Sequence, residues 1–269
     1  MKKHTLVWLS ILCIALIYAC ARVPISNRRQ VNLIPESEMM TLSFQAYQEF
    51  LDTNKVLPAN DHRTVMVRNI GQKIKNSVEA FLAENNQSQR STGFAWEFNV
   101  VDDELVNAWC MPGGKVVVYT GILPVTQDEK SLAVVMGHEI AHAIARHGNE
   151  RMSQGLIAQF GAAVLSTAMD QKPEITKGIF LGAYGIGANL GILGYSRNHE
   201  IEADKMGLVF MAMAGYDPNS AIAFWERMAA MGGQKPPQLL STHPSDEVRI
   251  ATLREFMPQA MKYYKPTGQ

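Results

Sequence analysis

The strongest constraint in this sequence is the segment VMGHEIAHAI, residues 135–144, which places His138 and His142 four residues apart. Residues with this spacing lie on one face of a helix, so both imidazoles can bind one metal ion. Glu139 projects about 100° around the helix from His138, where its carboxylate can address a water molecule at the metal. The segment therefore predicts a helix that carries two metal ligands and a general base.

The start of this helix is also visible in the sequence. Thr126 and Glu129 fit a capping box, in which each side chain would bind a free backbone N–H of the other residue, and the helix would then run to about His147.

Catalytic zinc commonly has three protein ligands and one open position. A third ligand must therefore come from another part of the chain.

The segment SRNHEIEAD, residues 196–204, is the candidate source of that ligand. Glu200 and Asp204 share a helix face, so one can bind the metal while the other accepts the free N–H of a ligating histidine. Glu202 is expected to point away from this face. Acidic residues on a helix are usually only solvated, and paired histidines can be ordinary helix residues. The assignment therefore depends on the two segments together.

Together, HExxH and the downstream SRxxExxAD pattern resemble the HtpX and CAAX prenyl endopeptidase family of zinc metallopeptidases, metallopeptidase family 48, over about residues 35–257. The chain especially resembles the periplasmic lipoprotein members of that family. The resemblance implies an α+β, zincin-like (gluzincin) fold, mostly helical, with a small sheet whose edge strand lines the active-site cleft. It implies one zinc ion per chain, with His138, His142 and Glu200 as ligands, Glu139 as general base and Asp204 as the carboxylate that orients a ligand.

Two further segments are similar to motifs of the same family. The segment NAWCMPGG, residues 107–114, resembles the edge strand to which an extended substrate adds, which implies that Asn107, Ala108 and Trp109 bind substrate. His243, in the segment THPS with Arg249 downstream, would stabilise the oxyanion or hold the enzyme latent at the open metal position; alternatively it is an exposed loop residue. Other residues receive structural interpretations: Cys110 as an inert buried thiol, and His62, His147 and His199 without a catalytic role.

The remaining sequence predicts mainly helices around a short sheet. Strands are expected at 94–101 and 115–120, and the segment 105–111 lies between them in the sequence. Helices are expected at 36–51, 62–85, 150–169, 179–193, 197–213, 218–231 and 245–256, with Asp217 as the N-cap of the helix at 218–231. Residues 178–196 have no charge and many glycines, which favours an apolar flap or core helix pair; a membrane-spanning hairpin is the alternative.

The N-terminus resembles a bacterial lipoprotein signal, because two lysines precede an uncharged run that ends at Cys20. The alternative is an ordinary signal with an incidental cysteine. We divide the chain into a signal peptide at 1–19, the lipidated Cys20 and a tether at 20–34, and a single zinc metallopeptidase domain at 35–269. This division predicts a lipid-anchored protein of the cell envelope, at the outer membrane and facing the periplasm.

The expected function is zinc-dependent endopeptidase activity on unfolded or membrane-associated envelope proteins, as part of protein quality control. Nucleic acid is not an expected partner, because 25 basic residues balance 25 acidic ones. One alternative is a chaperone-like assembly factor with little or no proteolytic activity. Another is a zinc hydrolase of small amides, which would need a closed pocket in place of an exposed edge strand.

Overall fold

The structure is a computed structural model that describes residues 20–160, 176–180, 195–231, 239–240, 243 and 247–266. The predicted signal peptide lies outside these residues, as does most of the apolar segment 178–196. No helix among the described residues is both long and apolar enough to cross a membrane.

Three short strands form the central sheet, close to where the sequence predicts them. They are β3 (Glu97–Val101), β4 (Ala108–Met111) and β5 (Lys115–Tyr119), in the order β3-β5-β4. β3 runs parallel to β5 and β4 runs antiparallel to it. β4 is therefore an edge strand of the described sheet.

Helices make up most of the described chain, as predicted. They are α2 (Glu36–Thr53), α3 (His62–Glu84), α4 (Leu123–Thr126), α5 (Glu129–Ala145), α6 (His147–Phe160), α9 (Arg197–Met213), α10 (Ser220–Ala230) and α12 (Glu247–Ala260). Short 3-10 turns are η1 (Ser88–Arg90), η2 (Thr120–Ile122) and η4 (Met261–Tyr263).

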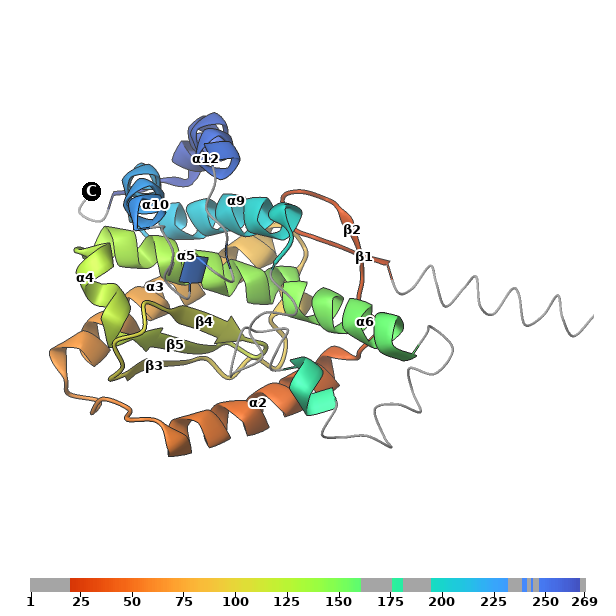
Figure 1. The fold of residues 1–269 in the computed structure, drawn as a ribbon. Helices are drawn as coiled ribbons and strands as arrows, with labels where there is room; N and C mark the ends of the chain where they lie inside the picture. The colour runs from red at the N-terminus through yellow and green to blue at the C-terminus, as the bar shows by residue number, and fades with distance from the viewer. Residues whose placement is uncertain are drawn as a thin grey trace, which may run out of the picture.

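Helices cover both faces of the sheet, so its strands are apolar on both sides. On β5, Val116 and Val118 belong to the main core with α3 and α5, whereas Val117 and Tyr119 pack with α2 on the opposite face. In Figure 1, α2 lies along one face of the sheet, α5 runs along the other, and α9 lies on the far side of α5. The predicted metal-binding helix is thus enclosed between the sheet and α9.

The start of α5 differs from the predicted capping box. Thr126 belongs to α4, where its hydroxyl donates to the Leu123 carbonyl. Gln127 has a positive φ of 68°, which ends α4 and leaves Asp128 in an extended conformation. The Asp128 carboxylate then accepts the Ser131 N–H at 2.7 Å and caps α5. The capping-box prediction is wrong because this turn puts Asp128 at the N-cap.

The other helix ends differ only locally from the prediction. α10 begins at Ser220, three residues after the predicted cap Asp217, whose carboxylate accepts the Asn219 N–H instead. α5 ends at Ala145, because Arg146 adopts a left-handed conformation with φ 61° and ψ 32°. α6 then begins at His147, so a single residue, Arg146, separates the two helices.

An ordered hairpin stands where the sequence predicts an irregular tether. Strands β1 (Cys20–Arg22) and β2 (Arg29–Val31) pair antiparallel, and Val23 between them is fully buried in the main core. Arg28 donates to Glu150 on α6 and to Glu202 on α9. These partners are more than 120 residues away in the sequence, so periodicity within the segment could not indicate them. In Figure 1 the hairpin passes beside the ends of α6 and α9.

Candidate metal centre

Four buried side chains from three parts of the chain converge on one point. His138 and His142 come from successive turns of α5, Glu200 from the first turn of α9, and His243 from the segment before α12. Their nearest ligand atoms all lie within 4.8 Å of one another. The structure thus brings together the three predicted ligands and adds His243 to them.

The distances within this group fit a tetrahedral metal ion. Ligand atoms about 2.1 Å from a tetrahedral zinc ion are about 3.4 Å apart. The Nε2 atoms of His138 and His142 are 3.0 Å apart. His138 Nε2 lies 3.4 Å from Glu200 Oε2, and His142 Nε2 lies 3.5 Å from Glu200 Oε1. His243 Nδ1 is 3.2 Å from His138 Nε2 and 3.0 Å from Glu200 Oε1. The donor set of imidazole nitrogens and a carboxylate is one that zinc accepts.

Glu139 lies at the edge of this group. Its carboxylate is buried, and its Oε1 atom has no hydrogen-bond partner among the described residues. His243 Nε2 lies 3.6 Å from this oxygen. Burial raises the pKa of Glu139, although His243 and His138 act in the opposite direction. A carboxylate with a raised pKa and a free oxygen is suited to accept a proton.

Asp204 holds His138 from the side opposite the metal position. Its Oδ1 atom is 2.9 Å from His138 Nδ1, and Arg249 contacts both carboxylate oxygens at 2.7 and 2.8 Å. Arg249 also contacts Glu200 at 2.9 Å and lies 4.1 Å from the Trp225 ring centroid. Burial alone would raise the pKa of Asp204, but Arg249 and His138 lower it. Asp204 is therefore an anion that fixes one tautomer of His138.

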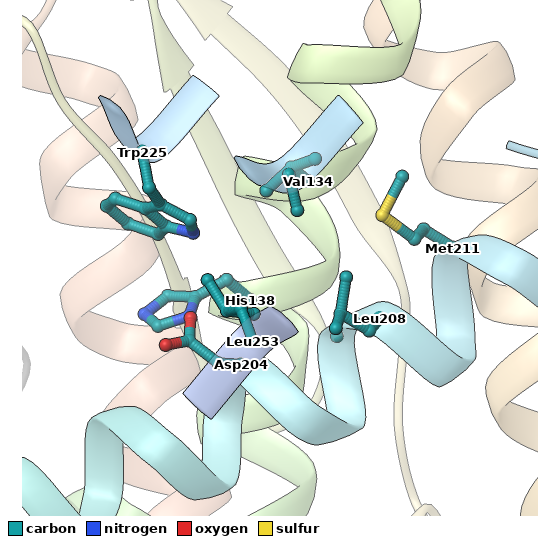
Figure 2. Close-up of a pocket in the computed structure, with 9 residues that line it drawn as sticks. Val134, His138, Asp204, Leu208, Met211, Trp225 and Leu253 are labelled. Atoms are coloured by element: carbon teal, nitrogen blue, oxygen red, sulfur yellow. The ribbon is translucent and has the colours of Figure 1, made fainter. Parts of the chain in front are cut away.

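The pocket beside His138 and Asp204 is mainly apolar. Figure 2 shows the two side chains pointing toward one another under the indole of Trp225. The ring centroids of His138 and Trp225 are 5.4 Å apart in an edge-to-face arrangement. The other lining side chains labelled in Figure 2 are Val134, Leu208, Met211 and Leu253. This packing restricts the orientation of the His138 ring.

His142 has a different supporting partner, which the sequence did not indicate. Its Nδ1 atom lies 2.9 Å from Nδ1 of His147, whose Nε2 atom lies 3.0 Å from Glu202 Oε2. Glu202 is not among the four converging residues; it is buried between His147 and Arg28. His199, on the same helix, contacts Glu150 at 3.1 Å. His62, in contrast, is largely exposed.

These residues could not be found from helix spacing alone. His147 follows His142 by five residues, which would place it on another face of a continuous helix. The left-handed residue Arg146 changes that direction, and a left-handed arginine has no clear sequence signature. The available signal was the group of one histidine and three acids at 199–204, with His147 and Glu150 just after the HExxH segment.

The predicted substrate-binding residues lie on or next to the edge strand β4. Asn107, Ala108 and Trp109 are all buried, so only their backbone could meet a substrate. The Trp109 ring packs edge-to-face on Phe50, 5.0 Å away, and belongs to the core on this face of the sheet. Cys110 is buried, and this burial raises the pKa of its thiol well above the ordinary value. The charge of Glu139 has a smaller effect in the same direction. This agrees with its interpretation as an inert thiol.

Comparison with known proteins identifies the family of this chain. Residues 71–257 match the family described as Peptidase family M48. The mitochondrial metalloendopeptidase OMA1 of Schizosaccharomyces pombe is 34% identical, over 88% of this chain and 66% of that protein. The Saccharomyces cerevisiae protein of the same name is 30% identical, with 91% and 71% covered. The putative beta-barrel assembly-enhancing protease of Vibrio cholerae is 34% identical, with 59% and 34% covered.

These names correct one expectation and leave another without support. The chain spans between 34% and 71% of the length of these three relatives. The predicted location at the outer membrane, facing the periplasm, is wrong, because the relatives that match most of this chain are named as mitochondrial proteases. All three names describe peptidases, so they lend nothing to the non-proteolytic alternative. Because residues 71–257 match this family and the chain is similar to these proteases, this chain belongs to peptidase family M48.

Proposed function

We propose that this protein is a zinc-dependent metalloendopeptidase. One observation carries the proposal: the Nε2 atoms of His138 and His142 face one another at 3.0 Å, with the Glu200 carboxylate within 3.5 Å of both. Without a cation, Glu200 would meet these nitrogens only at distances too long for good hydrogen bonds. The three side chains are therefore the proposed zinc ligands.

The chain's own residues would provide the proton transfers. When bound, zinc lowers the pKa of water toward neutrality and polarises a carbonyl group. Glu139 would take the proton from the attacking water and return it to the leaving amine, a role supported by its free, buried Oε1 atom. Asp204 would keep His138 in the tautomer with the proton on Nδ1. His243 would either stabilise the oxyanion or close the site.

Unfolded or membrane-associated proteins are the proposed substrates, within protein quality control. An extended substrate would pair with β4 through its backbone at residues 107–109, which would make this edge strand one wall of the cleft. The position of β4 at the edge of the described sheet, next to α5, supports this arrangement. The name of the Vibrio cholerae relative, a putative beta-barrel assembly-enhancing protease, supports substrates that are proteins in the course of assembly.

Two further parts of the sequence-based assignment belong to this proposal. Residues 35–269 would form a single metallopeptidase domain. A lipid on Cys20 stays a prediction from the sequence, as does the signal peptide before it.

The direct test is cleavage of unfolded casein by the full-length protein before and after zinc removal. Chelation should abolish cleavage, and one equivalent of zinc should restore it. Cleavage of long peptides but not of dipeptide amides would separate an endopeptidase from a hydrolase of small amides. A protein that binds no zinc, or that cleaves casein equally well after complete chelation, would contradict the proposal.

A further inference from the structure

The two histidines of α5 are supported in different ways. His138 Nδ1 faces a carboxylate directly, that of Asp204 at 2.9 Å. His142 Nδ1 faces another imidazole, that of His147 at 2.9 Å. A ligating histidine needs a partner at its second nitrogen to fix its tautomer and orientation. The partner of His142 can itself exist in two tautomers, so something must fix that partner.

The hydrogen bonds allow one consistent arrangement of protons. If His142 Nε2 is free to bind a metal ion, its proton is on Nδ1 and is donated to His147 Nδ1. His147 must then carry its own proton on Nε2, which lies 3.0 Å from Glu202 Oε2. An ionised carboxylate can only accept a hydrogen bond. Glu202 therefore fixes the tautomer of His147, and through it the tautomer of His142.

Glu202 is held in place by the N-terminal hairpin. Its Oε1 atom accepts hydrogen bonds from Ser26 at 2.6 Å and from Arg28 Nε at 2.8 Å. Arg28 also binds Glu150 through two bonds of 2.7 Å, so one guanidinium is shared by two buried carboxylates. Arg28 donates to both carboxylate oxygens of Glu202 and Ser26 donates to one of them, so these contacts use the carboxylate as an acceptor.

We propose that His147 and Glu202, with Glu202 held by Arg28, are positioning residues for His142, and that the N-terminal hairpin is thereby part of the metal site. This inference rests on the proposed function, because it requires His142 to bind the metal. It goes beyond the HExxH segment and Glu200, since it assigns a role in metal affinity to a segment more than 100 residues away from both histidines of α5.

The competing explanation is that the same bonds only attach the hairpin to the protein. Glu150 offers a matched control for it, because both carboxylates are buried, both bind Arg28 and both contact a histidine. Glu202 contacts His147, which in turn contacts His142. Glu150 contacts His199 instead. A role limited to attachment predicts equal effects for the two carboxylates.

The experiment compares Glu202→Gln and Glu150→Gln in the full-length protein. Two quantities are measured: the zinc dissociation constant, by competition with a chromophoric chelator, and the thermal unfolding midpoint of the metal-free protein. We expect similar losses of thermal stability in the two variants. Glu202→Gln should bind zinc about tenfold or more weakly, whereas Glu150→Gln should bind it as the unaltered protein does.

A second pair of variants tests His147 itself. His147→Leu removes the acceptor for His142 and should weaken zinc binding by about 10- to 100-fold. His147→Asn places a carbonyl oxygen near the position of Nδ1 and should restore most of the affinity. If His147→Leu does not fold, the comparison of Glu202 with Glu150 decides the question.

Equal zinc affinities of Glu202→Gln and Glu150→Gln would overturn the inference, as would a folded His147→Leu that binds zinc normally. Both outcomes leave the proposed function standing, provided that the unaltered protein binds zinc and cleaves casein. Failure of the unaltered protein to bind zinc would instead contradict the proposed function itself.

Discussion

Gly137 on α5 and Gly207 on α9 lie back to back where the two helices cross. A Cβ atom on Gly207 would come within 2.9 Å of the His138 backbone nitrogen, and one on Gly137 within 3.1 Å of the Gly207 carbonyl oxygen. This contact sets the distance between the helix that carries the histidines and the helix that carries Glu200 and Asp204. The geometry of the metal centre therefore depends on two residues without side chains.

Substitution of Gly207 by alanine should damage both stability and metal binding. The added methyl group meets backbone atoms, which cannot rotate away, so the helices must separate. We expect a loss of roughly 1–3 kcal/mol in the free energy of unfolding and weaker zinc binding. Thermal unfolding and chelator competition measure the two effects. Gly178→Ala is the control, because a Cβ atom there meets no atom of the described residues within 4 Å; equal behaviour of the two variants would contradict the argument.

Glu139→Gln and Glu200→Gln should separate catalysis from metal binding. Glu139 is not among the four converging ligands, so Glu139→Gln should retain zinc and lose about 10²- to 10⁴-fold in casein cleavage. Glu200→Gln should lose zinc at the same protein concentration. Metal analysis after dialysis, together with the cleavage rate, gives both results. A fully active Glu139→Gln would exclude Glu139 as the general base.

The His243→Ala variant distinguishes the two roles left open for this residue. His243 Nδ1 lies within ligand spacing of both His138 and Glu200, so it would fill the position that a catalytic zinc site keeps open. We therefore expect faster casein cleavage after its removal. Slower cleavage with unchanged zinc content would instead indicate stabilisation of the oxyanion, and an unchanged rate would leave His243 without a catalytic role.

Acid should weaken the attachment of the hairpin through Glu202. Its pKa is lowered from 4.5 to about 2 in the folded protein, so the stabilisation is complete above the unfolded pKa and is lost as the pH falls from about 4.5 toward 2. The measurement is thermal unfolding of the metal-free protein between pH 6 and about pH 3. Glu202→Gln should lose less stability over this range than the unaltered protein, and parallel curves would contradict the assignment.

The residues predicted from sequence were those whose relationship depends on local spacing. The histidines at 138 and 142, and the acids at 200 and 204, share helix faces because a helix repeats every 3.6 residues, whatever surrounds it. The strands at 97–101 and 115–119 followed in the same way from runs of β-branched residues.

The residues that were missed depend on contacts between distant parts of the chain. Arg28 meets Glu150 and Glu202 only because the hairpin folds back onto α6 and α9. The cap of α5 was misassigned by two residues because the positive φ of Gln127 is a property of the packed turn. Neither feature alters the local patterns from which helices and strands are predicted.

The left-handed conformation of Arg146 has a consequence for how this protein tolerates change. Because one backbone torsion aims His147 at His142, an insertion or deletion at the junction of α5 and α6 would rotate that imidazole away even if both helices survived. Glycine should be accepted at position 146, since it adopts this conformation readily, whereas valine or isoleucine should be rejected. Selection for zinc affinity would thus act on a position that never approaches the ion.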